Sequence, residues 1–355
     1  MRRISQYLLG RLSRGYVVAL IAVGALFWLM EMLQRFEELD RAGLRLLDMA
    51  LDALMTVPGS LVVLAPVVVV MATAGVMGAL QNQRELVVMR VSGISRLELT
   101  RLALVPALVL GLAALAVSEW VSPLLERPVS QAGMDDLGEA GLMDEAHGLW
   151  SRSSGEFLNV REIRVGLDPR DIRIYSFDDQ GRLIRHIRAA SAQIRAPDRW
   201  MLENVVIRRF DGTEPASESL PLWEWQSFLS GDDLELLRQP PSSLSLSELW
   251  VYVQGLLERD EEALEFELFL WRRITLPLAC LAMALVAVGS VTGNARTRSL
   301  SMRISIALGI GIAYQLITEV VSYAGLLMRS DPLLVAVLPP TVLAVLGCMM
   351  ILRQR

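Results

Sequence analysis

Long hydrophobic segments alternate with polar ones along this chain, and six of them are long enough to cross a bilayer. They occupy residues 15–33, 54–80, 99–121, 274–291, 304–328 and 333–352. A helix rises about 1.5 Å per residue, so roughly 20 apolar residues span a hydrocarbon core of about 30 Å. The pattern predicts a multi-pass α-helical membrane protein with six transmembrane helices, three on each side of a long polar interval.

The polar interval 122–246 has a different period. Residues 171–177 and 182–188 alternate apolar and polar side chains and are separated by a turn that contains Gly181. Residues 200–210 repeat the alternation, which is typical of half-buried strands. Several short strands in about 120 residues suggest a β-sandwich or a jelly roll. We therefore expect an inserted β-jelly-roll domain in this interval.

Three regions follow from these patterns. Residues 1–121 are expected to hold the first three transmembrane helices, and 122–246 the β domain. Residues 247–355 are expected to hold the last three transmembrane helices. Residues 245–267 read as one amphipathic helix, rich in Glu and capped near Ser247, which precedes them.

The placement of arginines predicts the orientation in the membrane, because cytoplasmic loops carry an excess of basic residues. The N-terminal segment, the loops after the second and fourth hydrophobic segments and the C-terminal tail would all lie on one side of a six-helix protein. We therefore expect both termini to be cytoplasmic and the β domain to lie on the other side. The arginines concerned are Arg2, Arg3, Arg11, Arg14, Arg84, Arg90, Arg96, Arg101, Arg296, Arg298, Arg303, Arg353 and Arg355.

Composition supports the membrane assignment and excludes several kinds of chemistry. Of the 355 residues, 53% are hydrophobic and 21% charged, and the mean hydropathy is +0.42. The 34 basic residues are all arginine, so the lysine of a standard phosphate-binding loop is missing. A net charge of −5 without a basic stripe argues against a nucleic-acid partner. Two cysteines and two histidines make a metal centre improbable, and we expect neither a cofactor nor catalytic residues.

The segment of residues 81–95 is a candidate for contact with a soluble protein. Leu86, Val87 and Met89 alternate with charged side chains that include Glu85 and Arg90, and Gly93 can end a short helix as its C-cap. Such an amphipathic helix can dock into a groove on a partner, or it can lie among the lipid head groups.

Ionisable residues within the hydrophobic segments suggest an alternative function. Glu31 and Glu119 lie near the outer ends of their segments, and Glu319 lies deeper. Intramembrane carboxylates are functional candidates, and Glu119, Glu319 and His147 would suit a membrane-embedded periplasmic hydrolase or transferase that modifies lipids. That function requires the three groups to converge within hydrogen-bond reach. A proton-coupled transporter is less well supported, because such proteins usually have broken helices in matching positions of two halves, and only the second segment, with Pro58, Gly59 and Pro66, is visibly broken.

Four short motifs in this order resemble the LptF/LptG family of lipopolysaccharide export permeases, and the G-type subunit more than the F-type. They are residues 85–89 (ELVVM) with Ser92-Gly93, residues 119–123 (EWVSP), residues 147–151 (HGLWS), and Trp271 ahead of Pro277-Leu278. The resemblance covers essentially the whole chain: three helices, a β domain and three helices.

This resemblance implies a function and partners that the residues alone do not give. Members of the family are permease subunits of an ABC transporter in the inner membrane of Gram-negative bacteria. An F-type and a G-type subunit pair, a dimer of the cytoplasmic ATPase LptB binds below them, and LptC joins with a single transmembrane helix. The complex extracts lipopolysaccharide from the membrane and passes it through periplasmic jelly rolls to a bridge towards the outer membrane.

The resemblance also implies roles for individual residues. Glu85 matches the acid of the helix that couples the permease to its ATPase, and Arg90 and Gly93 share that segment. Basic residues at the outer ends of the helices would hold lipid phosphates, where the alternative is an interfacial arginine that reaches for water. Aromatic residues in the spans would meet acyl chains, where the alternative is plain packing. The candidates are Arg35, Arg41 and Arg127 for phosphates, and Phe27, Trp28 and Tyr314 for acyl chains.

Overall fold

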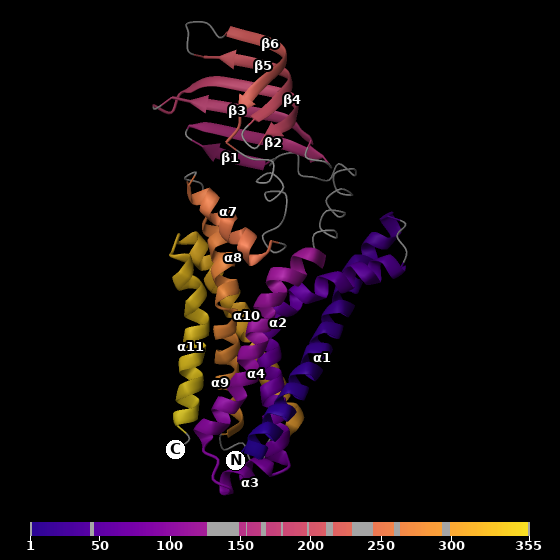
Figure 1. The fold of residues 1–355 in the computed structure, drawn as a ribbon, viewed down its shortest axis with the longest axis vertical. Helices are drawn as coiled ribbons and strands as arrows, with labels where there is room; N and C mark the ends of the chain where they lie inside the picture. The colour runs from indigo at the N-terminus through magenta and orange to yellow at the C-terminus, as the bar shows by residue number, and fades with distance from the viewer. Residues whose placement is uncertain are drawn as a thin grey trace. The chain divides into compact units, whose positions relative to one another are not determined.

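The computed structural model describes most of the chain as two compact units. The described residues are 2–42, 46–125, 149–153, 155–164, 168–178, 180–196, 199–210, 216–228, 244–258, 263–292 and 299–353. One unit combines Met1–Glu126 with Leu264–Arg355 and is helical, and the other is Arg127–Ala263 and contains a β-sheet (Figure 1). Each unit is described by itself below.

The helical unit has the character of a multi-pass membrane protein, as the hydrophobic segments predicted. Among the described residues, five helices are long and apolar enough to cross a membrane, and a sixth span results if α8 and α9, bent by 51°, count as one. The elements are α1 (Arg2–Ala42), α2 (Leu46–Asn82), α3 (Glu85–Val91), α4 (Arg96–Ala116) continued by the π-helical turn η1 (Val117–Val121), α8 (Leu264–Ile274), α9 (Leu276–Thr292), α10 (Leu300–Leu327) and α11 (Pro332–Leu352).

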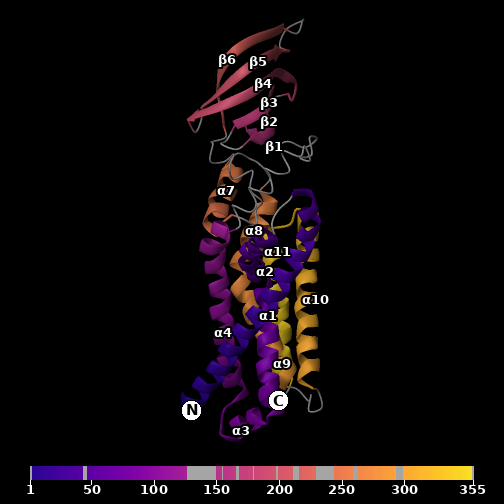
Figure 2. The ribbon, with the colours of Figure 1, turned by 90° about the vertical axis from the view of Figure 1, so that its right-hand side faces the viewer.

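Helix α2 forms the centre of this unit and packs against α1, α9 and α10 (Figures 1 and 2). Two thirds of its most apolar window is buried inside the unit, against about a tenth for α1. Small residues permit this close packing: a Cβ at Gly311 of α10 would lie 2.9 Å from Val67 of α2. Helix α9 packs in the same way against α4 and α11.

Among the described residues of the second unit, six strands form one antiparallel sheet. The strands are β1 (Leu149–Ser153), β2 (Glu156–Arg164), β3 (Asp168–Phe177), β4 (Leu183–Ala196), β5 (Arg199–Arg209) and β6 (Ala216–Gln226), and each pairs with the next in the chain. An antiparallel β domain is therefore confirmed. The described strands follow one another as a meander, whereas a double-sheet jelly roll has Greek-key crossovers. Consecutive strands pair because few residues separate them in the sequence, and Gly155 and Gly181, which lie between β1 and β2 and between β3 and β4, both have positive φ.

A bend across this sheet lets one face enclose a core. Asp171 of β3 and Asn204 of β5 have positive φ values of 46° and 52°. The burial pattern changes phase at Asn204, from Trp200 and Leu202 on one side to Val205 and Ile207 on the other. These four side chains are 4% exposed or less, in a core that also includes Leu158, Ile172, Ile174, Ile187 and Trp225.

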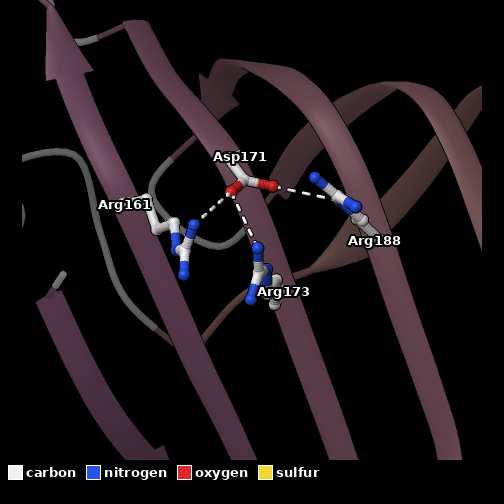
Figure 3. Close-up of polar contacts among 4 residues, drawn as sticks. All are labelled: Arg161, Asp171, Arg173 and Arg188. Atoms are coloured by element: carbon white, nitrogen blue, oxygen red, sulfur yellow. Dashed lines mark hydrogen bonds and ion pairs between the residues drawn. The ribbon is translucent and has the colours of Figure 1, made fainter. Parts of the chain in front are cut away.

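At the bend, the carboxylate of Asp171 ties three strands together (Figure 3). It accepts from Arg173 Nη2 at 3.0 Å and from Arg188 Nε at 3.1 Å, and Arg161 Nη1 lies 3.6 Å away. Arg173 and Arg188 face each other directly across the strand pair, so the acid offsets a like-charge repulsion. Partial burial raises the pKa of Asp171, but the two arginines outweigh it and hold that pKa below its ordinary value.

The expectation of a single amphipathic helix over residues 245–267 is wrong. The structure has α7 (Leu246–Glu258), then a non-helical Ala263, then α8, and the two helices belong to different units. The run 258–262 (ERDEE) contains no apolar side chain, so the hydrophobic stripe that would continue the helix is interrupted. The cap of α7 is Ser245, whose hydroxyl accepts from the Glu248 N–H at 3.2 Å, while the Glu248 carboxylate accepts from the Ser245 N–H at 3.0 Å.

Candidate functional site

Helix α3, on the loop between α2 and α4, is shorter than the predicted segment 81–95, whose first two residues still belong to α2. It ends at Val91, followed by the cap Ser92 and then Gly93, in a Schellman motif: the Gly93 N–H donates to the Arg90 carbonyl at 3.0 Å and the Ile94 N–H donates to the Met89 carbonyl at 3.2 Å. Gly93 has a φ of 93°, which favours glycine. The motif therefore gives α3 a fixed length and end.

The two faces of α3 differ sharply. Leu86 and Met89 are buried in the core of the helical unit. On the opposite face, Val87, Val88 and Val91 are 50%, 64% and 85% exposed. An exposed stripe of three valines on a helix anchored from behind is the arrangement expected of a helix that enters a groove on another protein.

Glu85 begins α3 and is held by the first helix. Its Oε2 accepts from the Tyr7 hydroxyl at 2.9 Å, and its Oε1 lies 3.5 Å from Arg11 Nη2. Arg11 also lies over the Tyr7 ring, 5.3 Å from the centroid. One turn of α1 therefore presents two donors to one carboxylate, and Leu8 and Leu12 bury the other side of that turn in the same core as Leu86.

Sequence reasoning missed Tyr7 and Arg11. Their only signal is the four-residue spacing, which places both side chains on one face of α1. Of the other residues proposed for coupling, Arg90 is half-buried in the last turn of α3, and Gly93 is the C-cap glycine described above.

The residues proposed for lipid contact are scattered. Arg35 and Arg41 belong to α1, and Arg127 lies outside the described residues. Trp28 is engaged between helices, because its Nε1 donates to the Ala50 carbonyl of α2 at 3.0 Å. The other two aromatic candidates differ in burial. Phe27 is half-buried, and Tyr314 lies in the core of the helical unit at 8% exposure.

A bidentate ion pair between α8 and α10 was also missed by sequence reasoning. Arg272 Nη2 donates to Glu319 Oε1 at 2.6 Å, and Arg272 Nη1 donates to Glu319 Oε2 at 3.2 Å. Glu319 is thus engaged by an arginine, while Glu119 lies in η1 and His147 falls outside the described residues. In the part of the chain that the structure describes, no group of three or more His, Cys, Asp or Glu side chains could hold a metal ion. The geometry gives the lipid-modifying alternative no support.

On the β-sheet, three rings form a ladder surrounded by arginines. Trp150 stacks on Tyr175 with centroids 6.0 Å apart, and Tyr175 stacks on His186 at 4.7 Å. Partial burial lowers the pKa of His186, and Arg208, Arg173 and Arg188 lower it further because they repel a second positive charge.

Comparison with known proteins identifies the family. The family described as "Lipopolysaccharide export system permease LptF/LptG" matches residues 6–353. The chain is 24% identical over 302 residues to the lipopolysaccharide export system permease protein LptG of Haemophilus influenzae, covering 85% of this chain and 84% of that relative. It is 24% identical over 305 residues to the LptG protein of Escherichia coli strain K12, with the same shares covered. A match across nearly the whole length, on a chain with apolar spanning helices and an antiparallel β domain, leads to one conclusion: this chain belongs to the LptF/LptG family of lipopolysaccharide export permeases.

Proposed function

We propose that this chain is the G-type permease subunit of an ABC transporter that extracts lipopolysaccharide from the inner membrane and passes it to a periplasmic bridge towards the outer membrane. It pairs with an LptF-type permease and an LptC-type single-span protein. A dimer of an LptB-type cytoplasmic ATPase hydrolyses the ATP, since this chain contains no lysine for a phosphate-binding loop. Family membership supports the transport function, and α3 is the observation that supports its coupling to ATP.

Helix α3 is the coupling helix of this proposal. Its exposed valines Val87, Val88 and Val91 enter a groove on the ATPase, and Glu85 at its first turn faces an arginine there. Glu85 keeps a side-chain exposure of 30% despite its contacts with Tyr7 and Arg11, and a carboxylate can accept further hydrogen bonds. Because Leu86 and Met89 are anchored in the core, a displacement of α3 is transmitted to the spanning helices.

The lipid path completes the proposal. Both termini and α3 are cytoplasmic, and the β domain is periplasmic, as the distribution of arginines indicates. Arg35, Arg41 and Arg127 hold lipid phosphates bidentately at the outer ends of the helices. Phe27, Trp28 and Tyr314 meet acyl chains, which for the buried Tyr314 requires α10 to move.

Charge placed on the valine stripe tests the coupling. Val91→Arg puts a cation on the face that enters the groove, so we expect the amount of ATPase that co-purifies with the permease pair to fall roughly tenfold, the factor for a loss of about 1.4 kcal/mol. The matched control is Leu222→Arg, which places the same cation at an exposed apolar residue of β6. Wild-type recovery of the ATPase with Val91→Arg would refute docking through α3.

A further inference from the structure

The span made of α8 and α9 is bent for identifiable reasons. Pro277 has no N–H to donate to the Arg273 carbonyl. One turn earlier, the Thr275 hydroxyl donates back to the carbonyls of Trp271 at 2.9 Å and Arg272 at 3.1 Å, a pattern that often bends helices. The apex is wedged against α4, where a Cβ at Gly111 would lie 2.7 Å from the Pro277 Cα. The bend therefore has a fixed apex, and the position of α8 depends on what holds it beyond that apex.

Beyond the apex, α8 is held by an apolar contact and by the ion pair. Leu268 and Trp271 pack against Val335 and Ala336 of α11. On α10, the Glu319 carboxylate accepts hydrogen bonds from both terminal nitrogens of Arg272, which lies two residues before the end of α8. The apolar contact lets α8 slide along α11. A bidentate pair between a planar guanidinium and a carboxylate instead fixes both the distance between Arg272 and Glu319 and their relative orientation.

Neither partner of this pair suits its surroundings alone. Glu319 lies within an apolar span, where Leu316, Ile317 and Val320 around it are exposed on the surface of the unit. A lone charge in such surroundings is costly, so the two groups hold each other in place more firmly than an ion pair in water does. The pair therefore links the directions of α8 and α10.

Helix α8 is also where the chain passes from one unit to the other. The unit that contains the sheet ends at Ala263, and the helical unit resumes at Leu264, the first residue of α8. We propose that the Arg272–Glu319 pair is a clasp between α8 and α10 that fixes the position of α8, the first helix after the β domain in the chain, and that transfer of lipid to that domain requires it. Arg272 and Glu319 are positioning residues in this inference, which rests on the proposed function.

The test measures lipid transfer and ATPase binding separately in the reconstituted complex. A photo-reactive side chain at Leu220, half-buried at the rim of the β-domain core, reports lipopolysaccharide that reaches that domain. We expect Arg272→Gln and Glu319→Gln each to lower ATP-dependent labelling roughly fivefold to tenfold, which lies within the range of couplings between contacting residues, and to leave ATPase co-purification unchanged. The double exchange Arg272→Glu with Glu319→Arg rebuilds the pair and should restore most of the labelling.

A matched control and a second variant keep the outcomes separate. Glu265→Gln removes an exposed carboxylate from the first turn of α8 and should label like wild type. If a single variant does not fold, the double variant Arg272→Gln with Glu319→Gln, which leaves no lone charge, should fold and still fail to label. The clasp is overturned if the single variants label like Glu265→Gln, if the exchange restores nothing, or if ATPase binding falls in parallel. Absence of ATP-dependent labelling in wild type would instead overturn the proposed function.

Discussion

Glu85 shows how one side chain can join two helices and still face outward. Tyr7 and Arg11 of α1 occupy one side of its carboxylate, and the contacts are partly exposed to solvent. In water such contacts add little to stability. Their effect is to fix the orientation of the Glu85 carboxylate on α3, so that less conformational entropy is lost when a partner binds it.

Removing one contact at a time tests this role. Tyr7→Phe deletes one hydroxyl, and we expect it to weaken ATPase binding roughly twofold to tenfold, the range for one hydrogen bond. Arg11→Gln should do less, because the Arg11–Glu85 pair is exposed. The measurement is the Kd of the ATPase for the detergent-solubilised permease pair.

The matched control for Arg11→Gln is Arg14→Gln, which removes the same charge from an exposed position one turn further along α1. In a double-mutant cycle with Glu85→Gln, the effect of Tyr7→Phe should disappear, because the carboxylate it serves has lost its charge. If Tyr7→Phe binds like wild type while Glu85→Gln binds weakly, Tyr7 does not position Glu85.

His186 makes the stability of the β domain depend on pH. Its pKa is lower in the folded chain than the unperturbed value of about 6.5. As the pH falls from about 7 to about 5, the unfolded chain takes up the proton first, so the free energy of unfolding decreases. Pulse proteolysis of the full chain in urea should show this decrease, and His186→Gln should abolish it.

His147 provides the matched control, because it is the other of the two histidines in the chain. His147→Gln should leave the decrease between pH 7 and pH 5 in place. A pH profile that His186→Gln leaves unchanged would contradict the role given to the arginines around His186. The lowered pKa of Asp171 acts at more acidic pH: it stabilises the fold above the ordinary carboxyl pKa of about 3.9, and this contribution is lost as the pH falls below that value.

Single residues could be predicted from the sequence only where their role is local. Gly93 was identifiable because a C-cap glycine follows directly from the helix before it. Tyr7 and Arg11 meet Glu85 across more than 70 residues, and Arg272 meets Glu319 across 47. No spacing rule connects such pairs, because they meet only through the tertiary packing of the helical unit.

At the scale of elements, small residues set how closely the helices pack. A Cβ at Gly347 of α11 would lie 2.8 Å from Leu285 Cβ and 2.9 Å from the Val286 nitrogen of α9. Backbone atoms cannot move away cheaply, so Gly347→Ala should destabilise the helical unit by about 1–3 kcal/mol. The thermal unfolding midpoint of the detergent-solubilised chain measures this.

Gly309→Ala is the matched control, since a Cβ at Gly309 of α10 meets no atom within 4 Å. The added methyl group only improves helix propensity there, by at most about 1 kcal/mol. Its midpoint should be equal to or above that of wild type. Equal midpoints for the two variants would show that α9 and α11 pack less closely than the structure indicates.

Element types were predictable where one period dominates a segment. Apolar runs predicted the spanning helices, and alternation over 171–177, 182–188 and 200–210 predicted β3, β4 and β5. The bend at Asp171 and Asn204 was not predicted. The apolar positions do shift by one residue between Leu202 and Val205, but such a shift alone does not say that the backbone adopts a positive φ at Asn204. The prediction of a single helix over 245–267 was wrong because the charged run 258–262 was interpreted as the polar face of one helix, whereas it separates α7 from α8.

For the whole molecule, we propose that the work is divided between chains. This polypeptide supplies spanning helices and a β domain, with α3 proposed as the helix that couples it to an ATPase, and its sequence contains no lysine with which to build a standard ATP site. Family membership assigns it to lipopolysaccharide export, and the ATPase is expected on a separate chain. The central claim is that transport into the β domain requires that second chain.

The most direct test places this chain and its LptF-type partner in vesicles with lipopolysaccharide and ATP, with and without the LptB-type ATPase. Labelling from a photo-reactive side chain at Leu220 and release of inorganic phosphate are measured together. The account predicts that both occur only when the ATPase is present. Hydrolysis of ATP, or labelling of lipopolysaccharide to the same extent, by the permease pair alone would contradict it.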